Sequence, residues 1–387
     1  MSEEKSFSRK RLLMYAIGFV FNLGYAIPTY VNSTFLAQFT NEKLVGIIYT
    51  ASSILAIAMF IEMPGILKRF GNYKTTLALL FLQFFSLASL TVGNQVLGII
   101  AAFMLNFVTI SLTNFTLDVF LESFSTNTKT GRIRGAFLTI VNIAWISSPL
   151  LASRILGDNA FNNIYATSGI LLLPVIALVL FGLHSAKEPV YTRLPFWKSF
   201  GEVWADRNIK AILLIQFLLQ FFYAWMIIYM PIYLHNTTGF EWSTIGVIFT
   251  IMLLPFLFLE GPLGRLADKN GEKKVLSMGF VILGVSTISI AFITDHNPIV
   301  WTIVLFCTRI GAASVEVMTE TYFFKKVDAT RTNLISFSRM MRPFAYILSP
   351  IVATLLFTVF DIKGLFIFLG FLMFYGLRYT MSIDDVA

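Results

Sequence analysis

Twelve stretches of the sequence are mainly apolar, and short polar segments separate them. Each stretch is close to the length of about 20 residues that a helix needs to cross a bilayer. The pattern therefore predicts an all-α, polytopic membrane protein with twelve transmembrane helices. We place the spans at residues 12–36, 44–66, 75–93, 96–121, 134–156, 161–183, 209–234, 243–264, 274–293, 298–323, 334–359 and 362–380.

Charged and proline positions recur at a fixed distance in the second half of the chain. Asp118 and Glu122 lie four residues apart near the end of one apolar stretch, and Glu316 and Glu320 repeat this pair 198 residues later. The segment around Ser148-Pro149 recurs around Ser349-Pro350 at an offset of 201. Repeats of this length indicate two related halves, an arrangement typical of transporters with the substrate path between the halves. We predict six-helix bundles at 1–183 and 209–387, with a cytoplasmic central loop at 184–208.

The composition excludes a soluble chain. Hydrophobic residues make up 57% of the sequence and charged residues only 13%, and the mean hydropathy is +0.76. Soluble domains carry about 25% charged residues, so lipid must solvate much of this surface. A single cysteine and three scattered histidines predict no disulfide framework, no metal site and no cofactor.

Lysine and arginine fall mainly on one side of the predicted helices. Of the 29 such residues, 23 lie at the N-terminus, the C-terminus, the central loop and alternate short loops. Because basic residues accumulate in cytoplasmic loops, we expect both termini to be cytoplasmic in a cell (inner or plasma) membrane. The net charge of +8 then reflects membrane sidedness and does not indicate nucleic-acid binding. Residues 194–204 mix aromatic and charged side chains and predict a short helix on the inner leaflet.

The loop after the eighth span carries the most specific motif. Its sequence is Gly264-Arg265-Leu-Ala-Asp268-Lys-Asn-Gly271-Glu-Lys-Lys. This segment resembles the loop signature of the major facilitator superfamily, which implies twelve helices, alternating access and no enzymatic activity. The equivalent loop of the first half, with Lys68, Arg69 and Gly71, is a degraded copy. Most of the family keeps the first copy better, so this chain inverts the usual pattern.

The loop residues suggest a gate. Gly271 permits a tight turn, and Asp268 can cap a helix N-terminus across the interface between the halves. Basic residues hold such a loop at the anionic inner leaflet. We predict that the contact stabilises the outward-facing state; the alternative is that the loop is only a rigid connector.

Several ionisable residues lie within or close to the spans. At the centre of a span each costs roughly 2.5–3.5 kcal/mol on insertion scales. Each half brings an acidic pair near a basic pair, which is Arg132 and Arg134 in the first half and Arg339 and Arg342 in the second. The alternatives are salt bridges that gate the cytoplasmic side and a carboxylate that carries a proton, with Glu316 as the first candidate and Asp118 as the second. The residues concerned are Asp118, Glu122, Glu316, Glu320, Arg339 and Arg342.

Arg309 lies in the middle of the tenth span, with no acid within four residues. It could bind an anionic group of a substrate or keep Glu316 ionised. Uncharged polar residues in other spans are candidates to line the substrate cavity, although such residues more often join helices. The candidates are Asn22, Tyr25, Asn142, Gln216, Gln220, Tyr223 and Trp225.

We interpret the chain as a monomeric secondary active transporter for a small-molecule substrate, driven by protons. Efflux of an amphipathic, drug-like solute by antiport is slightly preferred over proton-coupled uptake of a sugar or organic anion. A membrane enzyme would need metal ligands or a nucleophile–base pair, and no such pattern is visible. A non-transporting sensor or scaffold is the alternative from another class.

Overall fold

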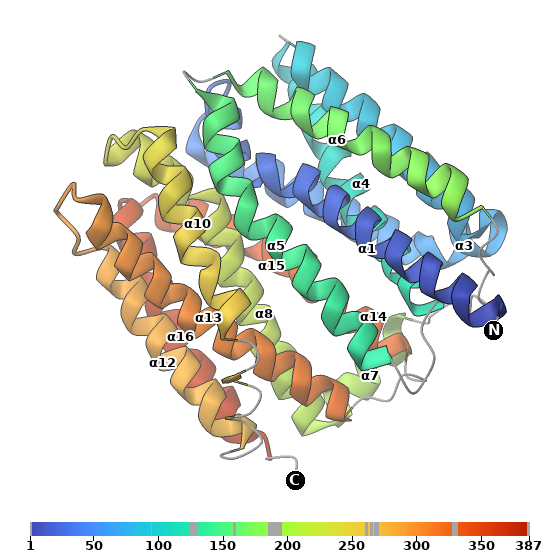
Figure 1. The fold of residues 1–387 in the computed structure, drawn as a ribbon. Coiled ribbons are helices and arrows are strands. Elements are labelled where there is room, and N and C mark those ends of the chain that lie inside the picture. Colours follow the sequence, from blue (N-terminus) through green and yellow to red (C-terminus); the bar gives the residue numbers. More distant parts are fainter. Residues whose placement is uncertain are drawn as a thin grey trace. The chain divides into compact units, whose positions relative to one another are not determined.

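In the computed structural model the chain is described over residues 2–93, 95–123, 130–157, 160–184, 196–259, 262–263, 266, 271–326 and 332–384. Over these residues the regular structure is helical, without a strand (Figure 1). The predicted all-α, polytopic membrane fold is therefore confirmed.

The chain divides into two compact units. Unit 1 comprises Met1–Asn41 and Ala51–Arg193, and unit 2 comprises Glu42–Thr50 and Leu194–Ala387. The first nine residues of one long helix thus group with the second unit. The helices of the first part of the chain are α1 (Ser2–Thr29), α2 (Asn32–Ala37), α3 (Glu42–Val92), α4 (Val96–Ser123), α5 (Thr130–Leu156) and α6 (Phe161–Gly182).

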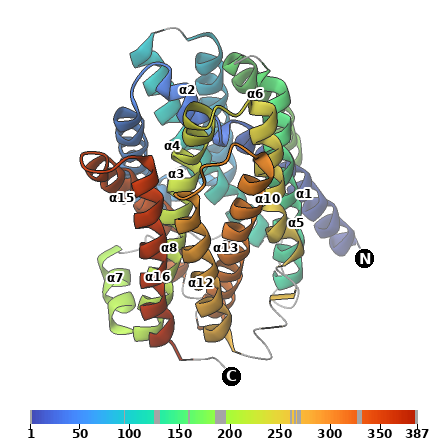
Figure 2. The same cartoon turned by 90° about the vertical axis from the view of Figure 1, so that its left-hand side faces the viewer.

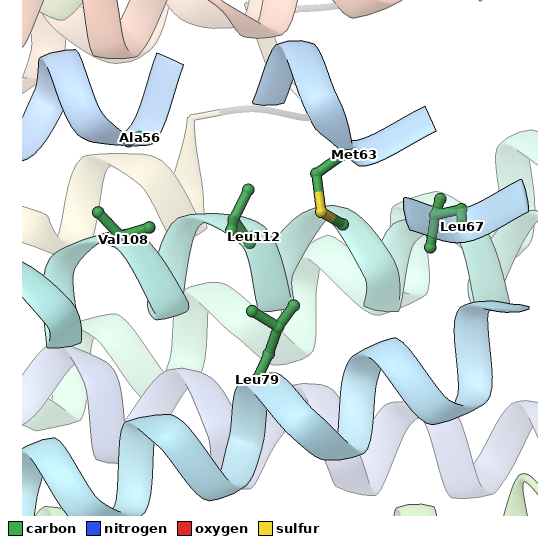
Figure 3. Close-up of a cluster of buried hydrophobic side chains, with 6 residues drawn as sticks. All are labelled: Ala56, Met63, Leu67, Leu79, Val108 and Leu112. Atoms are coloured by element: carbon green, nitrogen blue, oxygen red, sulfur yellow. The ribbon is translucent and has the colours of Figure 1, made fainter. Parts of the chain in front are cut away.

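The core of unit 1 forms between the two halves of α3 and α4. Ala56, Met63 and Leu67 lie on one face of α3, since their spacing of seven and four residues returns to the same side of a helix. Figure 3 shows Ala56 and Met63 above Val108 and Leu112 of α4, with Leu67 to the right and Leu79 approaching from the second half of α3. The apolar repeat that predicted a membrane span therefore also supplies the contacts between neighbouring spans. Elsewhere in this unit, α1 packs against α5 and α6.

A glycine interrupts the helical conformation of α3 between the second and third predicted spans. Gly71 has φ 79° and ψ 164° inside α3, a conformation that is essentially restricted to glycine. Asn72 follows it, is buried, and donates from Nδ2 to the Thr116 carbonyl of α4 at 3.0 Å. Gly271 has a closely similar conformation, φ 83° and ψ 149°, before α12. Gly271 thus has the positive φ that a tight turn requires, and Gly71 has it at the corresponding place in the first half.

Unit 2 contains a long sequence of helices around α8, which packs against α13, α15 and α16. Trp225 of α8 is fully buried and donates from Nε1 to the Ser349 carbonyl at 2.6 Å. The elements are α7 (Phe196–Ala205), α8 (Arg207–Ile228), α9 (Met230–Ile232), a π-helical turn η1 (Tyr233–Thr237), α10 (Trp242–Phe258), α12 (Glu272–Ile290), α13 (Pro298–Lys326), α14 (Thr332–Arg339), α15 (Met341–Leu356) and α16 (Ile362–Ser382).

Glycines bring α12 close to both of its neighbours, α13 and α16 (Figures 1 and 2). A Cβ atom at Gly311 of α13 would lie 2.6 Å from the Leu283 backbone nitrogen of α12. A Cβ atom at Gly370 of α16 would lie 2.8 Å from the Gly284 carbonyl oxygen. These backbones approach because neither glycine carries a side chain, the device by which membrane helices pack tightly.

Ten segments of the described chain are long and apolar enough to cross a membrane, compared with the twelve predicted. The predicted span 243–264 corresponds to α10, which has only 17 residues. The predicted span 334–359 is divided at Met340 into α14 and α15. Pro343 explains this break, because proline has no N–H to donate to the carbonyl four residues earlier, on Arg339, where α14 ends.

One end of unit 2 is fixed by polar contacts. Lys325 at the end of α13 forms a salt bridge with Glu272 at the start of α12, with 2.6 Å between Nζ and Oε1. Asp206 caps α8 by accepting hydrogen bonds from the backbone of Asn208 and Ile209. Asn208 in turn donates to the Asp384 carboxylate and accepts from its backbone nitrogen. The predicted short helix in the central segment is present as α7.

Candidate functional site

The most distinctive group of polar side chains lies within unit 2, between α8 and α13. Tyr223 comes from α8, and Arg309 and Glu316 come from α13. These helices pack against each other, so residues about 90 positions apart in the sequence become neighbours. We call Tyr223, Arg309 and Glu316, together with Phe222, the Arg309 cluster.

Tyr223 binds the carboxylate that the sequence placed first among the proton-carrying candidates. Its hydroxyl donates to Glu316 Oε2 at 2.7 Å. Glu316 is half-buried, whereas Glu320, one turn further along α13, is exposed. Glu316 is therefore the less exposed of the two acids.

Arg309 is almost completely buried, with 1% of its surface exposed. Its Cζ lies 5.3 Å from the ring centroid of Phe222 and 5.5 Å from that of Tyr223. Both Nε and Nη1 are buried without a hydrogen-bond partner among the residues that the structure describes. Arg309 therefore has donor capacity that its own unit does not use.

The energies indicate that this arrangement is incomplete. A cation–π contact contributes on the order of 2 kcal/mol when it is desolvated. Withdrawing an arginine charge from water costs several kcal/mol even after the protein relaxes. The two aromatic rings next to Arg309 therefore offset only part of this cost. An anion that accepts hydrogen bonds from the unused Arg309 donors would offset the rest of this desolvation cost.

Tyr223 contacts both ionisable side chains. Arg309 and Glu316 are seven residues apart, which is about two turns or about 10.5 Å along a helix axis. The Tyr223 ring lies against the guanidinium of the first, and its hydroxyl reaches the carboxylate of the second. A change in the charge or position of Arg309 or Glu316 can therefore affect the other residue through the Tyr223 side chain.

The other predicted residues of α8 contact different neighbours. Gln216 accepts a hydrogen bond from the Ser338 hydroxyl of α14 at 2.7 Å. Trp225 bonds to α15, as described above, so its N–H is used in helix packing. Gln220 is half-buried. The structure thus brings Tyr223 into the Arg309 cluster and directs Gln216 and Trp225 elsewhere within unit 2.

The predicted polar residues of unit 1 are placed separately. Asn22 is buried and donates from Nδ2 to the Gly18 carbonyl one turn earlier. Tyr25 packs edge-on against Trp145, with centroids 5.1 Å apart. Asn142 and Asp118 are half-buried on α5 and α4. Glu122 falls near the end of α4, and its side chain lies outside the described residues.

The predicted gating loop is only partly described. Gly264, Arg265 and Asp268 lie outside the described residues. In the first-half copy Lys68 and Arg69 are exposed. The basic pair of the second half falls on two helices, with Arg339 at the end of α14 and Arg342 at the start of α15. Arg342 is exposed, with its Cζ 5.7 Å from the Tyr346 ring.

Sequence reasoning did not single out Phe222 or Glu272. Phe222 is one of 40 phenylalanines, and only its contact with Arg309 distinguishes it. Glu272 is buried with 2% exposure, and its position directly after the turning glycine of the loop motif could have identified it. Among the described residues, three or more His, Cys, Asp or Glu side chains nowhere gather in a way that could hold a metal ion.

Comparison with known proteins agrees with this architecture. Residues 212–381 match the family model described as Major Facilitator Superfamily. The second half of the chain is therefore similar in sequence to transporters of the major facilitator superfamily. This confirms the resemblance seen in the loop motif, and the match falls in the half that keeps the better motif. It also confirms the prediction that the chain is not an enzyme. A search of curated proteins found no match.

Solved transporter structures share the fold over nearly the whole chain. A POT family transporter in complex with 5-aminolevulinic acid has a TM-score of 0.80 at 13% identity, over 96% of this chain and 95% of that one. The nucleoside transporter NupG has a TM-score of 0.77 at 12% identity, over 96% and 98%. A bacterial homologue of the human lysosomal transporter Spinster, inward-facing and unoccupied, has a TM-score of 0.69 at 13% identity, over 97% and 93%.

Proposed function

We propose that this major facilitator-type protein is a proton-coupled secondary active transporter that works by alternating access. Glu316 is the residue that takes up and releases the proton. The observation that carries the proposal is the hydrogen bond from Tyr223 to Glu316 next to the buried Arg309. An ionisable residue inside a membrane segment is costly and is usually retained for a function of this kind.

The coupling can be followed through the Arg309 cluster. An ionised Glu316 accepts the hydrogen bond from Tyr223. A protonated Glu316 can itself donate a hydrogen bond, and the bond that it accepts from Tyr223 is weaker because its charge is gone. The ring that contacts Arg309 can then change position. Proton binding at Glu316 and solute binding near Arg309 thereby become linked equilibria, which coupled transport requires.

The preferred direction is efflux of an amphipathic solute by exchange for protons. Aromatic side chains surround the cluster, since Tyr223 also faces the Phe256 ring at 6.4 Å and the guanidinium rests on Phe222. Such surroundings suit a solute with an apolar body and a polar group. Uptake of an organic anion with protons is the alternative, and it has the same residues in the same roles.

The remaining predictions become part of the same proposal. Asp268 and Gly271 of the complete loop motif would stabilise the outward-facing state. Asp118, Glu122, Glu320, Arg339 and Arg342 would act as cytoplasmic gating charges. The protein would function as a monomer of two six-helix bundles in the cell membrane, with both termini in the cytoplasm.

Proton movement tests the proposal directly. Purified protein would be reconstituted into proteoliposomes that contain a fluorescent pH indicator, and a panel of solutes added outside. We expect some solutes to change the internal pH in wild-type vesicles and to leave protein-free vesicles unchanged. Solute movement without any accompanying pH change, in either direction, would contradict proton coupling while leaving the transporter assignment intact.

A further inference from the structure

The unused hydrogen-bond donors of Arg309 indicate what kind of solute this transporter takes. Arg309 is 1% exposed, and its Nε and Nη1 atoms have no hydrogen-bond partner among the described residues. A salt bridge with Glu316 would have used these donors, but Glu316 instead accepts from Tyr223. Among the described residues, the arginine therefore contacts two aromatic rings, and Nε and Nη1 have no acceptor.

The surroundings of Arg309 restrict its partner further. Thr308 and Ala312 next to it are small and fully buried. The Thr308 hydroxyl donates to the Leu305 carbonyl of its own helix at 2.6 Å. Phe222 and Tyr223 cover the guanidinium from α8. The described groups next to the arginine are thus mainly apolar, and its guanidinium is the cation among them.

We propose that Arg309 binds an acid group of the transported solute, so that the substrate is an organic anion with an apolar body. This inference rests on the proposed transport function and adds the substrate class. A guanidinium is planar and always charged, which matches the two or three equivalent oxygens of a carboxylate or phosphate. The apolar body would lie against the aromatic side chains.

Binding of the anion would also be linked to the proton. An acid group at Arg309 contacts the same Tyr223 ring whose hydroxyl holds Glu316. Two negative charges on either side of one tyrosine disfavour each other, so a bound anion favours protonation of Glu316. A symporter would carry the anion and the proton together. An exchanger would release one of them before it binds the other.

The test measures binding without transport. Compounds with phenyl, naphthyl and octyl bodies would each be prepared as a carboxylate, a phosphate monoester and a neutral primary amide. Thermal unfolding of the detergent-purified protein would be followed by tryptophan fluorescence at millimolar compound. We expect at least one acid of the series to raise the melting temperature and its matched amide to have no effect; carboxylate and phosphate arms show which acid is preferred.

Substitutions at Arg309 complete the test. Arg309→Met should weaken acid binding roughly ten- to hundredfold, the loss expected for hydrogen bonds to a charged group. Without ligand it should melt at a higher temperature than wild type, because it removes a buried charge that the protein does not pair. Arg309→Lys keeps the charge without the planar fork and should retain part of the binding. Arg154→Met, at an exposed arginine, is the matched control and should bind as wild type.

The outcomes separate this inference from the proposed function. Amides that bind as well as acids, acids that bind Arg309→Met as tightly as wild type, or a full series without any acid-dependent shift would each overturn it. None of these results depends on a proton gradient. Conversely, a protein that binds acids through Arg309 but moves no protons would retain this inference and lose the proposed coupling.

Discussion

At the scale of single residues, Tyr223 connects the two charges that matter most. Its hydroxyl donates to Glu316 at 2.7 Å, and its ring lies 5.5 Å from the Arg309 guanidinium carbon. Hydrogen bonds to ionised groups contribute about 1.5–3 kcal/mol, more than bonds between neutral groups. The hydroxyl, which is a small part of the side chain, is therefore expected to carry much of the linkage between proton and solute.

The Tyr223→Phe substitution should test this linkage. It removes only the hydroxyl and keeps the ring over Arg309, so solute binding should persist. We expect the initial rate of gradient-driven transport in proteoliposomes to fall roughly tenfold or more, in line with the loss of one charge-assisted hydrogen bond. Tyr375→Phe, at an exposed tyrosine of α16, should transport at the wild-type rate. Equal rates for the two variants would remove Tyr223 from the coupling pathway.

At the scale of helices, close packing and a terminal ion pair stabilise unit 2. Gly311 lies two residues from Arg309 and allows α13 to approach the backbone of α12. Lys325 and Glu272 then join the ends of the same two helices. The α12–α13 pair is therefore fixed both near its middle and at one end, which gives Arg309 and Glu316 a rigid support.

Gly311→Ala should destabilise the protein because the added Cβ would lie within 3 Å of three backbone atoms of α12. The helices would have to separate, at a cost of about 1–3 kcal/mol in the free energy of unfolding. Thermal unfolding in detergent would measure the effect. Gly98→Ala is the matched control, since a Cβ at Gly98 would meet nothing within 4 Å. It should be neutral or stabilising by up to about 1 kcal/mol. Equal melting temperatures would argue against tight α12–α13 packing.

Lys325→Met should also lower stability, because it leaves the buried Glu272 carboxylate without this partner. Removing one member of a fully buried pair costs about 3–5 kcal/mol, but the Lys325 side chain is 37% exposed. Water screens such a pair, so we expect a smaller loss of about 1–3 kcal/mol. The adjacent Lys326→Met, at an exposed position, should change stability by less than about 0.5 kcal/mol. Urea unfolding would compare the two; a smaller effect at Lys325 than at Lys326 would contradict the assignment.

At the scale of the whole molecule, the sequence was most informative where the bilayer itself imposes the pattern. Span lengths follow from local rules, and Gly71 and Gly271, which lie between predicted spans, both adopt a positive φ. The division of 334–359 was missed, although Pro343 was visible in the sequence. The Arg309 cluster could be predicted only as separate residues. Tyr223 and Glu316 are 93 positions apart, and no local pattern in one sequence predicts which faces of two distant helices meet.

The predicted orientation of the whole chain can be tested with single cysteines. Replacing Cys307, the one native cysteine, by serine gives a background without thiols. We expect cysteines at Lys74 and Lys274 to resist a membrane-impermeant thiol reagent in intact cells and to react after the cells are opened. A cysteine at Arg154 should react in intact cells. All three native side chains are exposed, so access is limited by the membrane. The opposite labelling pattern would place both termini outside.

The most direct test of the central claim is a comparison of accumulation and exchange in the Glu316→Gln protein. The amide keeps the size of the carboxyl group but cannot take up and release a proton at neutral pH. With a solute identified in the proteoliposome panel, we predict that Glu316→Gln no longer concentrates it against its gradient when a pH gradient is imposed. Exchange of labelled for unlabelled solute without a pH gradient should continue, and Glu320→Gln should impair accumulation less than Glu316→Gln does. Undiminished accumulation by Glu316→Gln would contradict the account and move the coupling site to another carboxylate, with Asp118 first.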